Sequence, residues 1–289
     1  MNHINNQNYL NKIQSDILTI MDEVDRVCRQ NSLRYYLIGG TLLGAVRHGG
    51  FIPWDDDLDI VMPREDFEQF LEIANKELAP KFYLNWISTN PKYWALFPKV
   101  CMRDTVFDEG KLTNCEAPGI FVDIFPLDLC GGYDVSMERN KSMLKRLHYI
   151  SAMNAKKAVT WKDKIYKGLA YIIPNSTCYK LQIETCTKVT RTGCTHYANF
   201  CSQYALIKQT MPVEWFGEGC DMRFRDRTFK APKEYLKVLI SIFGDTYNQL
   251  PPEEKRRCHY PVHVKFEDGS EMNFDSNLHK VTLSEQETF

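Results

Sequence analysis

The sequence predicts an α/β (α+β) fold, in which a core with a mixed sheet is followed by a mainly helical C-terminal part. In the first 130 residues, segments with apolar residues at helical spacing alternate with short apolar runs typical of strands. From residue 135 to 188 the apolar residues recur at helical spacing. We therefore expect a core at residues 1–130 and an accessory part at 131–289 that closes over a cleft in the core.

The first half of the chain starts with an amphipathic helix and continues through strands and further helices. Apolar residues from Leu10 to Cys28 recur at three- and four-residue steps, which predicts a helix over residues 9–31. A glycine pair interrupts the first strand run and Pro63 ends the second, so a helix is expected after each. The expected strands cover residues 34–38, 57–62, 82–87, 95–101 and 119–125, and the helix after Pro63 covers residues 64–78.

The second half is dominated by helical patterns, with a short hairpin near its end. Three helical stretches fill residues 135–188, and residues 190–230 lack a regular pattern. A further helix is expected over residues 231–243, where Gly244 stops it. An Asp268-Gly269 turn between short alternating runs predicts a hairpin over residues 263–274, followed by a tail.

Composition and charge exclude several classes of protein. The 289 residues carry 36 Lys and Arg against 37 Asp and Glu, a balance that argues against a general nucleic-acid binder. No window is apolar enough for a membrane span, and residues 1–11 have no apolar signal core, so we expect a cytoplasmic protein.

The ten cysteines are expected to be free thiols, because no secretion signal and no Cys-x-x-Cys pair accompanies them. Zinc binding by Cys178, Cys186, Cys194 and Cys201, with His196 nearby, is the alternative, although their spacing is longer than usual for zinc ligands.

Aspartates gather in and beside two of the expected strands. Alternation along the strand would place Asp55, Asp57 and Asp59 on one face, where they repel unless a cation neutralises them. Asp123 lies inside the apolar run 120–125, where an unpaired carboxylate is costly to bury. These residue types suit Mg²⁺, so we expect Asp57, Asp59 and Asp123 to bind metal and carry catalysis, with Asp123 a ligand or a proton acceptor. The alternatives are a solvated acidic turn at 55–59 and a structural Asp123, with Asp128 as its nearest substitute.

A glycine pair precedes the helix that leads to these aspartates. Gly39 and Gly40 let the backbone approach a phosphate closely, and the helix behind them offers free N–H groups. The hydroxyl of Thr41 is expected to donate to substrate or to cap that helix. The alternative is a plain turn between a strand and a helix.

Basic residues near these segments are candidates for contacts with phosphate or acceptor. They are Arg47, His48 and Lys99, and Arg103 is a further candidate. Surface positions without substrate contact are the alternative for each of them. Likewise, the aromatic residues Trp86, Tyr93, Trp94 and Trp161 are either core residues or a cage for a quaternary ammonium group.

Several of these segments together resemble a known family. Gly39-Gly40-Thr41 followed by Asp57-Leu58-Asp59-Ile60 resembles the signature of the nucleotidyltransferase superfamily. The longer strings resemble its LicD/fukutin branch, over roughly residues 30–260. These strings are residues 40–48, 50–59 and 121–128, then Phe243-Gly244-Asp245-Thr246-Tyr247 with Pro251-Pro252 and Lys255-Arg256.

The resemblance implies a nucleotidyltransferase-like core and a specific reaction. Members of this branch move a phospho-alcohol, often phosphocholine, from a CDP-linked donor such as CDP-choline to a sugar hydroxyl of a cell-surface glycan. Expected partners are such a donor and a glycan acceptor, free or lipid-linked, in teichoic acid or lipopolysaccharide precursors. Expected cofactors are one or two Mg²⁺ ions, with Mn²⁺ as a substitute. A lipid-linked acceptor implies peripheral contact with the inner face of the cell membrane.

Two other functions compete with this one. A nucleotidyltransferase would pass the nucleoside monophosphate itself to a small molecule or protein. A non-catalytic nucleotide or glycan binder would keep the fold without the chemistry, but all three carboxylates are present here.

Overall fold

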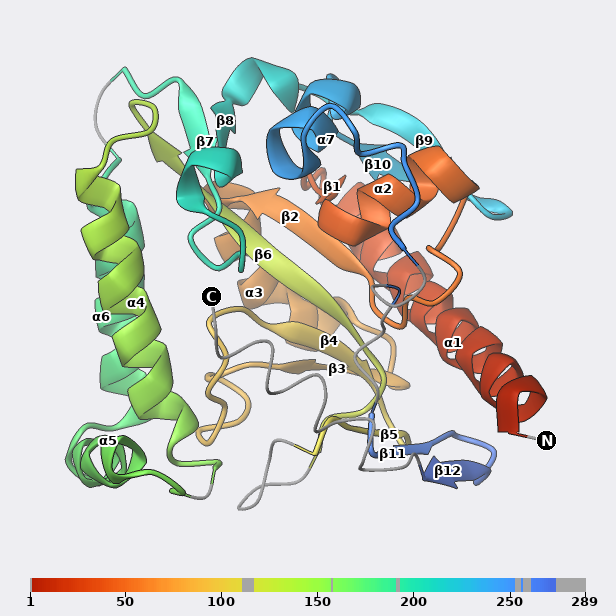
Figure 1. Ribbon diagram of the computed structural model, residues 1–289, viewed down its shortest axis with the longest axis horizontal. Helices are drawn as coiled ribbons and strands as arrows, with labels where there is room; N and C mark the ends of the chain where they lie inside the picture. The colour runs from red at the N-terminus through yellow and green to blue at the C-terminus, as the bar shows by residue number, and fades with distance from the viewer. Residues whose placement is uncertain are drawn as a thin grey trace.

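The computed structural model describes residues 2–110, 117–156, 158–190, 193–252, 256 and 261–273, and Cys115, Lys255 and Cys258 lie outside this set. The described residues form a seven-stranded mixed sheet at the centre of the molecule (Figure 1). Its main path runs β1–β2–β6–β4–β3, while β7 pairs with β6 and β8 with β7. Strands β2 and β6 are parallel, and the other pairs are antiparallel. The strands are β1 Tyr36–Leu37, β2 Asp59–Pro63, β3 Phe82–Asn85, β4 Lys99–Met102, β6 Phe121–Cys130, β7 His196–Ala198 and β8 Thr210–Pro212.

Two helices, α1 (Asn2–Gln30) and α3 (Arg64–Glu77), cover one face of the sheet (Figure 1). The sheet side chains on that face are apolar and almost fully buried: Ile60, Ile124, Val122, Val100 and Leu84. Both helices were predicted from the helical spacing of apolar residues and are confirmed. That spacing places their apolar stripes against this face.

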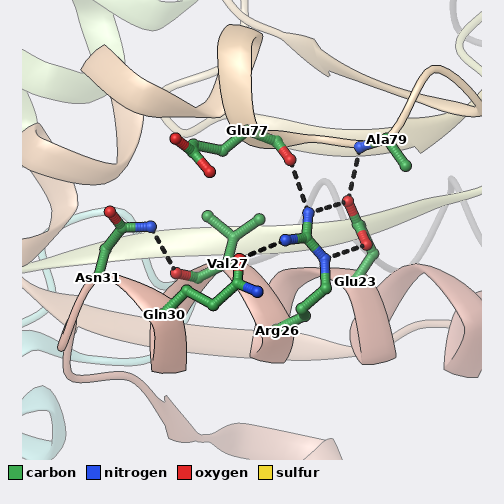
Figure 2. A network of polar contacts seen from close by, with 7 residues as sticks. All are labelled: Glu23, Arg26, Val27, Gln30, Asn31, Glu77 and Ala79. Atoms are coloured by element: carbon green, nitrogen blue, oxygen red, sulfur yellow. Dashed lines mark hydrogen bonds and ion pairs between the residues drawn. The ribbon is translucent and has the colours of Figure 1, made fainter.

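A polar network joins α1 to the chain just after α3 (Figure 2). Arg26 donates to both carboxylate oxygens of Glu23, to the carbonyl of Glu77 at 2.6 Å and to the side chain of Gln30 at 2.5 Å. Glu23 also accepts from the backbone N–H of Ala79 at 2.6 Å. The network satisfies polar groups where α3 ends and fixes its angle against α1.

Three helices from the middle of the chain form a layer beside the sheet (Figure 1). Helices α4 and α6 pack against each other, and α5 packs against α4. The prediction of a helical segment at 135–188 is confirmed. The helices are α4 Ser136–Ala152, α5 Trp161–Ile172 and α6 Asn175–Thr187.

The prediction of an irregular segment at 190–230 is wrong. Strand β7 extends the main sheet by pairing with the second half of β6, and β8 pairs with β7. Strands β9 (Cys220–Phe224) and β10 (Arg227–Ala231) form a hairpin that contacts β1. These strands have only three to five residues each, too short to show an alternating pattern. Two short 3₁₀ turns, Leu206–Gln209 and Val213–Trp215, connect them.

The remaining elements close the edges of the molecule. Helix α2 (Gly39–His48) packs against β2, β9 and α7 (Tyr235–Phe243). Strands β11 (His263–Lys265) and β12 (Glu271–Asn273) form the expected hairpin, which pairs with β5 (Val106–Asp108).

The fold is therefore α+β with a mixed sheet, as predicted. The division at residue 130 stays a prediction; the main sheet crosses it, and one apolar core runs from Ile13 to Phe266. None of the helices among the described residues combines the length and apolar composition needed to cross a membrane.

Candidate functional site

Four polar side chains form a row across the main sheet. Asp59 of β2 lies beside Asp123 of β6, Lys99 of β4 lies opposite Asp123, and Asn85 of β3 lies opposite Lys99. Partners across neighbouring strands point to the same face of a sheet. This polar row (Asp59, Asp123, Lys99, Asn85) therefore lies on the face opposite the one that α1 and α3 cover.

Lys99 and Asp123 form a buried ion pair at the centre of the row. Lys99 Nζ lies 2.6 Å from Asp123 Oδ1 and 3.3 Å from the centroid of the Phe121 ring. Burial raises the pKa of Asp123 to about 6, Lys99 opposes this rise, and the charges of Asp57 and Glu109 add to it. Burial opposes the charge on Lys99, but the carboxylates of Asp123 and Glu109 hold its pKa above the usual value. Lys99 therefore remains a cation at neutral pH.

The expected strand arrangement of Asp55, Asp57 and Asp59 is wrong, because β2 begins only at Asp59. Asp55 and Asp57 lie in the preceding segment, which is irregular. A turn opens it, with the Asp55 N–H donating to the Ile52 carbonyl, and the Gln14 amide donates to the Asp55 carbonyl at 2.7 Å. The segment nevertheless acts electrostatically on the row, because the charge of Asp57 raises the pKa of Asp123.

The start of α2 faces these aspartates. A Cβ at Gly39 would lie 3.7 Å from Asp59 Oδ2, and a Cβ at Gly40 would lie 3.1 Å from Asp55 Oδ2. The φ of Gly39 is +56°, a value that favours glycine. Thr41 Oγ1 accepts from the backbone N–H of Asp59 at 2.8 Å, so this buried hydroxyl positions the start of β2. The glycine pair and Thr41 thus lie beside the carboxylates, as their place in the sequence predicts.

Arg47 and His48 lie at the last turn of α2, and Arg47 contacts the segment after α7. Arg47 donates to the carbonyls of Tyr247 and Gln249, at 3.2 and 3.1 Å, and to His48 Nε2 at 3.0 Å. Burial lowers the pKa of both side chains, and for His48 the neighbouring Arg47 adds to the effect. Their role as substrate contacts stays a prediction. Arg103 lies outside the row, donating to the Pro80 carbonyl at 3.0 Å.

Three residues in or near the row were not predicted from the sequence. Asn85 belongs to the row itself, and Glu109 acts on the pKa of both Lys99 and Asp123. Burial raises the pKa of Tyr204 to about 12, with Asp59, Asp57 and Asp55 adding to the shift, so this tyrosine lies near the aspartates. An asparagine ending the apolar run 82–84 was a usable signal; nothing in the segment around Tyr204 pointed to it.

Asp128, the substitute considered for Asp123, has a separate role at the far end of β6. Its carboxylate accepts from Arg64 Nε and Nη2 at 2.8 and 3.0 Å, and the side chain is 1% exposed. Arg64 is the first residue of α3, so this ion pair joins the helix to the sheet.

The donor atoms near the row suit a hard divalent cation. Carboxylate oxygens of Asp59 and Asp123 on adjacent strands, with Asp57 close enough to act on Asp123, are the ligand type that Mg²⁺ prefers. In the part of the chain that the structure describes, no three His, Cys, Asp or Glu side chains are grouped as a metal site. In this arrangement Lys99 neutralises Asp123. The chemistry of the donor set fits Mg²⁺, and metal binding stays a prediction.

Two other sequence hypotheses are resolved by the packing. Cys178, Cys186, Cys194 and Cys201 are free thiols, and no zinc group occurs among the described residues. Among the aromatic residues, Trp86 and Tyr93 are buried in the core in contact with each other, whereas Trp161 is exposed on α5. They therefore do not form one cage.

Comparison with known proteins gives matches that cover the segments described above. Residues 32–172 match the domain family described as LicD/FKTN/FKRP, nucleotidyltransferase domain. The lipopolysaccharide cholinephosphotransferase LicD of Haemophilus influenzae is 27% identical over 252 residues, which cover 84% of this chain and 92% of that protein. The chain carries a LicD-family domain over residues 32–172. It is a LicD-type phosphotransferase, and the matched LicD domain contains the whole polar row.

Other relatives of this chain match shorter segments. The human ribitol 5-phosphate transferase FKRP is 59% identical over 34 residues, 12% of this chain and 7% of that protein. An uncharacterized protein of Rickettsia typhi is 34% identical over 93 residues, 32% of this chain and 28% of that protein. The match to FKRP supports the same LicD family.

Proposed function

We propose that the protein is a Mg²⁺-dependent phosphotransferase that moves phosphocholine, or a related phospho-alcohol, from a CDP-linked donor to a sugar hydroxyl of a cell-surface glycan precursor. The acceptor is a lipopolysaccharide or teichoic acid precursor, free or lipid-linked. One observation carries the proposal: Asp59 and Asp123 are in register on parallel strands in a chain that aligns with 92% of a lipopolysaccharide cholinephosphotransferase.

The proposed reaction is attack of the sugar hydroxyl on the phosphorus that carries the alcohol. A new P–O bond forms between this phosphorus and the sugar oxygen. The bond from the same phosphorus to the bridging oxygen of the diphosphate breaks, and CMP leaves with that oxygen. Asp123 would accept the hydroxyl proton, a role supported by burial, which raises the pKa of its carboxyl to about 6. Lys99, held against Asp123 at 2.6 Å, offsets charge on the phosphate oxygens.

In this proposal Asp57 and Asp59 would hold Mg²⁺, and Asp123 would be the third ligand if it is not the proton acceptor. One or two ions bind, and Mn²⁺ substitutes. When bound, the metal neutralises charge on the diphosphate. The free N–H groups at the start of α2, next to Gly39 and Gly40, bind phosphate oxygens.

We further propose that the α+β core is a nucleotidyltransferase-like fold, in line with the description of the matched domain family. The proposed setting is the cytoplasm, at the inner face of the cell membrane, where a nucleotide-linked donor meets a lipid-linked acceptor.

The test is a panel of donors incubated with the purified protein. CDP-choline, CDP-ethanolamine, CDP-glycerol and CDP-ribitol are supplied with a glycan acceptor, with and without Mg²⁺, and CMP release is measured. We expect Mg²⁺-dependent release of CMP with one donor, with the alcohol phosphate recovered on the acceptor. Nucleotide attached covalently to the acceptor would replace this proposal with nucleotidyl transfer, and absence of turnover with every donor would contradict both.

A further inference from the structure

Helix α5 carries an apolar ridge that faces away from the rest of the protein. Trp161, Ile165, Leu169 and Ile172 recur at steps of four, four and three residues, which places them on one side of the helix. Their exposed fractions are 68%, 55%, 38% and 77%. A surface helix normally turns polar residues outward, so this apolar ridge marks a candidate interaction surface.

The outward orientation of the ridge is fixed by packing on the opposite side of α5. Ala170 is buried there in a cluster with Leu147 and Ile150 of α4. A capping box at the start of α5, in which Thr160 and Asp163 bond each other's backbone N–H groups, holds the first turn. Figure 1 shows α5 at one end of the layer made by α4 and α6, away from the main sheet.

Positive charge surrounds the ridge. Lys162 and Lys164 are exposed and lie on its two sides, given the 100° step between successive helix residues. Residues 135–188 contain eleven Lys and Arg against three Asp and Glu, a net charge of +8 in a chain whose total is −1. The rest of the chain therefore carries −9, so basic charge is concentrated in the three-helix layer.

We propose that α5 docks on an anionic lipid surface, with its apolar ridge in the headgroup region and its lysines on lipid phosphates. An exposed tryptophan, aliphatic side chains and flanking lysines on one helix are the features of helices that lie in a bilayer interface. A second copy of the chain is a poor partner for the ridge, because it would bring a region of net charge +8 against its equal.

The three-helix layer also touches the segment that leads into the polar row. Lys156 Nζ lies 4.7 Å from the centroid of the Trp94 ring, and Asn175 donates to the Tyr93 carbonyl at 3.1 Å. Trp94 precedes Lys99 by five residues. If the acceptor is lipid-linked, as proposed above, docking of α5 brings the row to the surface where that acceptor lies.

The test is co-sedimentation of the full-length protein with vesicles of phosphatidylcholine alone or mixed with phosphatidylglycerol. We expect binding to the mixed vesicles only, weakened by salt. Ile165→Asp should reduce the affinity by ~10-fold or more, because it places a charge in the ridge. Lys162→Glu/Lys164→Glu should reduce it as well. The control is Ile207→Asp, which changes an equally exposed isoleucine (57%) outside α5 and should bind as the wild type does.

Three outcomes would overturn the proposal. The wild type fails to bind the mixed vesicles, or Ile165→Asp binds as well as the wild type. Alternatively, light scattering shows a dimer that Ile165→Asp converts to a monomer while vesicles are not bound, which assigns the ridge to a second copy. The assay needs no donor or acceptor, so failure of the proposed reaction leaves vesicle binding unaffected. Retained CMP release with a water-soluble acceptor would confirm that Ile165→Asp is folded.

Discussion

At the residue scale, the site depends on two carboxylates held next to each other on parallel strands. Asp59 and Asp123 are partners across β2 and β6, where like charges repel. Lys99 offsets this repulsion from the neighbouring strand, and the Thr41 hydroxyl holds the backbone of Asp59 in place. The result is a charged row on one face of the sheet. The neighbouring strand positions on the opposite face carry buried apolar side chains.

We expect Asp57→Asn and Asp59→Asn each to lower turnover by at least ~10³-fold with the fold intact, because each removes a charge proposed to bind metal. The measurement is CMP release at saturating Mg²⁺, with circular dichroism to report the fold. Asp104→Asn, at an exposed turn, is the control and should keep full turnover. Near-normal turnover in either site variant would contradict the assignment.

Lys99→Met should lower both stability and turnover, because it leaves the Asp123 carboxylate buried without its cation. Breaking a buried pair on one side costs about 3–5 kcal/mol. Thermal unfolding measures the first effect and CMP release the second. Lys81→Met removes a cation from an exposed pair with Glu267 and should change stability by less than ~1 kcal/mol. Equal losses of stability in the two variants would show that the buried Lys99–Asp123 pair contributes no more than the exposed pair, which would contradict the prediction.

At the scale of elements, α2 and the loop after it are held together by close backbone contact. A Cβ at Gly44 would lie 2.4 Å from the Gly50 carbonyl oxygen and 3.0 Å from the Ile52 N atom. The loop therefore passes directly over α2 before it reaches Asp55 and Asp57. A backbone neighbour moves less readily than a side chain, so this contact sets where the aspartates lie.

Gly44→Ala should destabilise the protein by about 1–3 kcal/mol and lower turnover, because the added methyl group pushes the aspartate segment away from α2. The matched control is Gly168→Ala in α5, where a Cβ meets no atom within 4 Å and helix propensity predicts a gain of up to ~1 kcal/mol. Chemical denaturation measures both. A Gly44→Ala protein as stable as the wild type would refute the close contact.

The Arg64–Asp128 pair joins α3 to β6 and should matter for stability. Asp128→Asn leaves the Arg64 guanidinium buried without its counter-charge, at an expected cost of about 3–5 kcal/mol. Arg64→Met/Asp128→Leu should recover most of this loss, since it removes both charges. Asp22→Asn, at a partly exposed pair with Arg227, is the control with an effect under ~1 kcal/mol. A double variant no more stable than Asp128→Asn would contradict the pairwise account.

At the scale of the whole molecule, the three-helix layer carries the basic charge and also a buried histidine whose pKa is shifted. His148 of α4 packs against Trp94 with ring centroids 5.3 Å apart, so it links the layer to the segment before the polar row. Burial lowers its pKa from 6.5 to about 4, and the charge of Lys156 adds to the effect. The folded protein therefore keeps this histidine neutral at neutral pH.

The sign of the pH effect follows from that shift. Between pH 6.5 and about 4 the unfolded chain binds a proton at His148 and the folded chain does not, so the contribution of His148 to stability falls as the pH falls through this window. The expected loss between pH 7.5 and 4.5 is about 2–3 kcal/mol. His148→Phe keeps the ring contact with Trp94 and should flatten this part of the profile. Thermal melts from pH 7.5 to 4.5 measure it, and parallel profiles for both proteins would contradict the prediction.

Much of the fold was predictable because its signals are local. The apolar steps in α1 and α3 and the helical pattern of 135–188 required only the chain itself. The carboxylate of Asp123 stood out because it interrupts an apolar run. The strands of 190–230 were missed because β7 and β8 have three residues each and are stabilised by β6, not by a pattern of their own.

The candidate site was predictable in part for the same reason. Gly39, Gly40, Asp57, Asp59 and Asp123 lie in segments whose composition is unusual in itself. The ion pair of Asp123 with Lys99, and the approach of Tyr204 to the aspartates, join residues 24 or more positions apart.

By itself the sequence determined the residue types of the site, the alternation of helices and strands in the core, and the likeness to the LicD family. Only the tertiary structure decided which residues meet: the row Asp59–Asp123–Lys99–Asn85, the loop position of Asp57, and the outward ridge of α5. The physical reason is that periodicity reports which face of an element is apolar, whereas strand order and register depend on contacts between segments far apart in the chain.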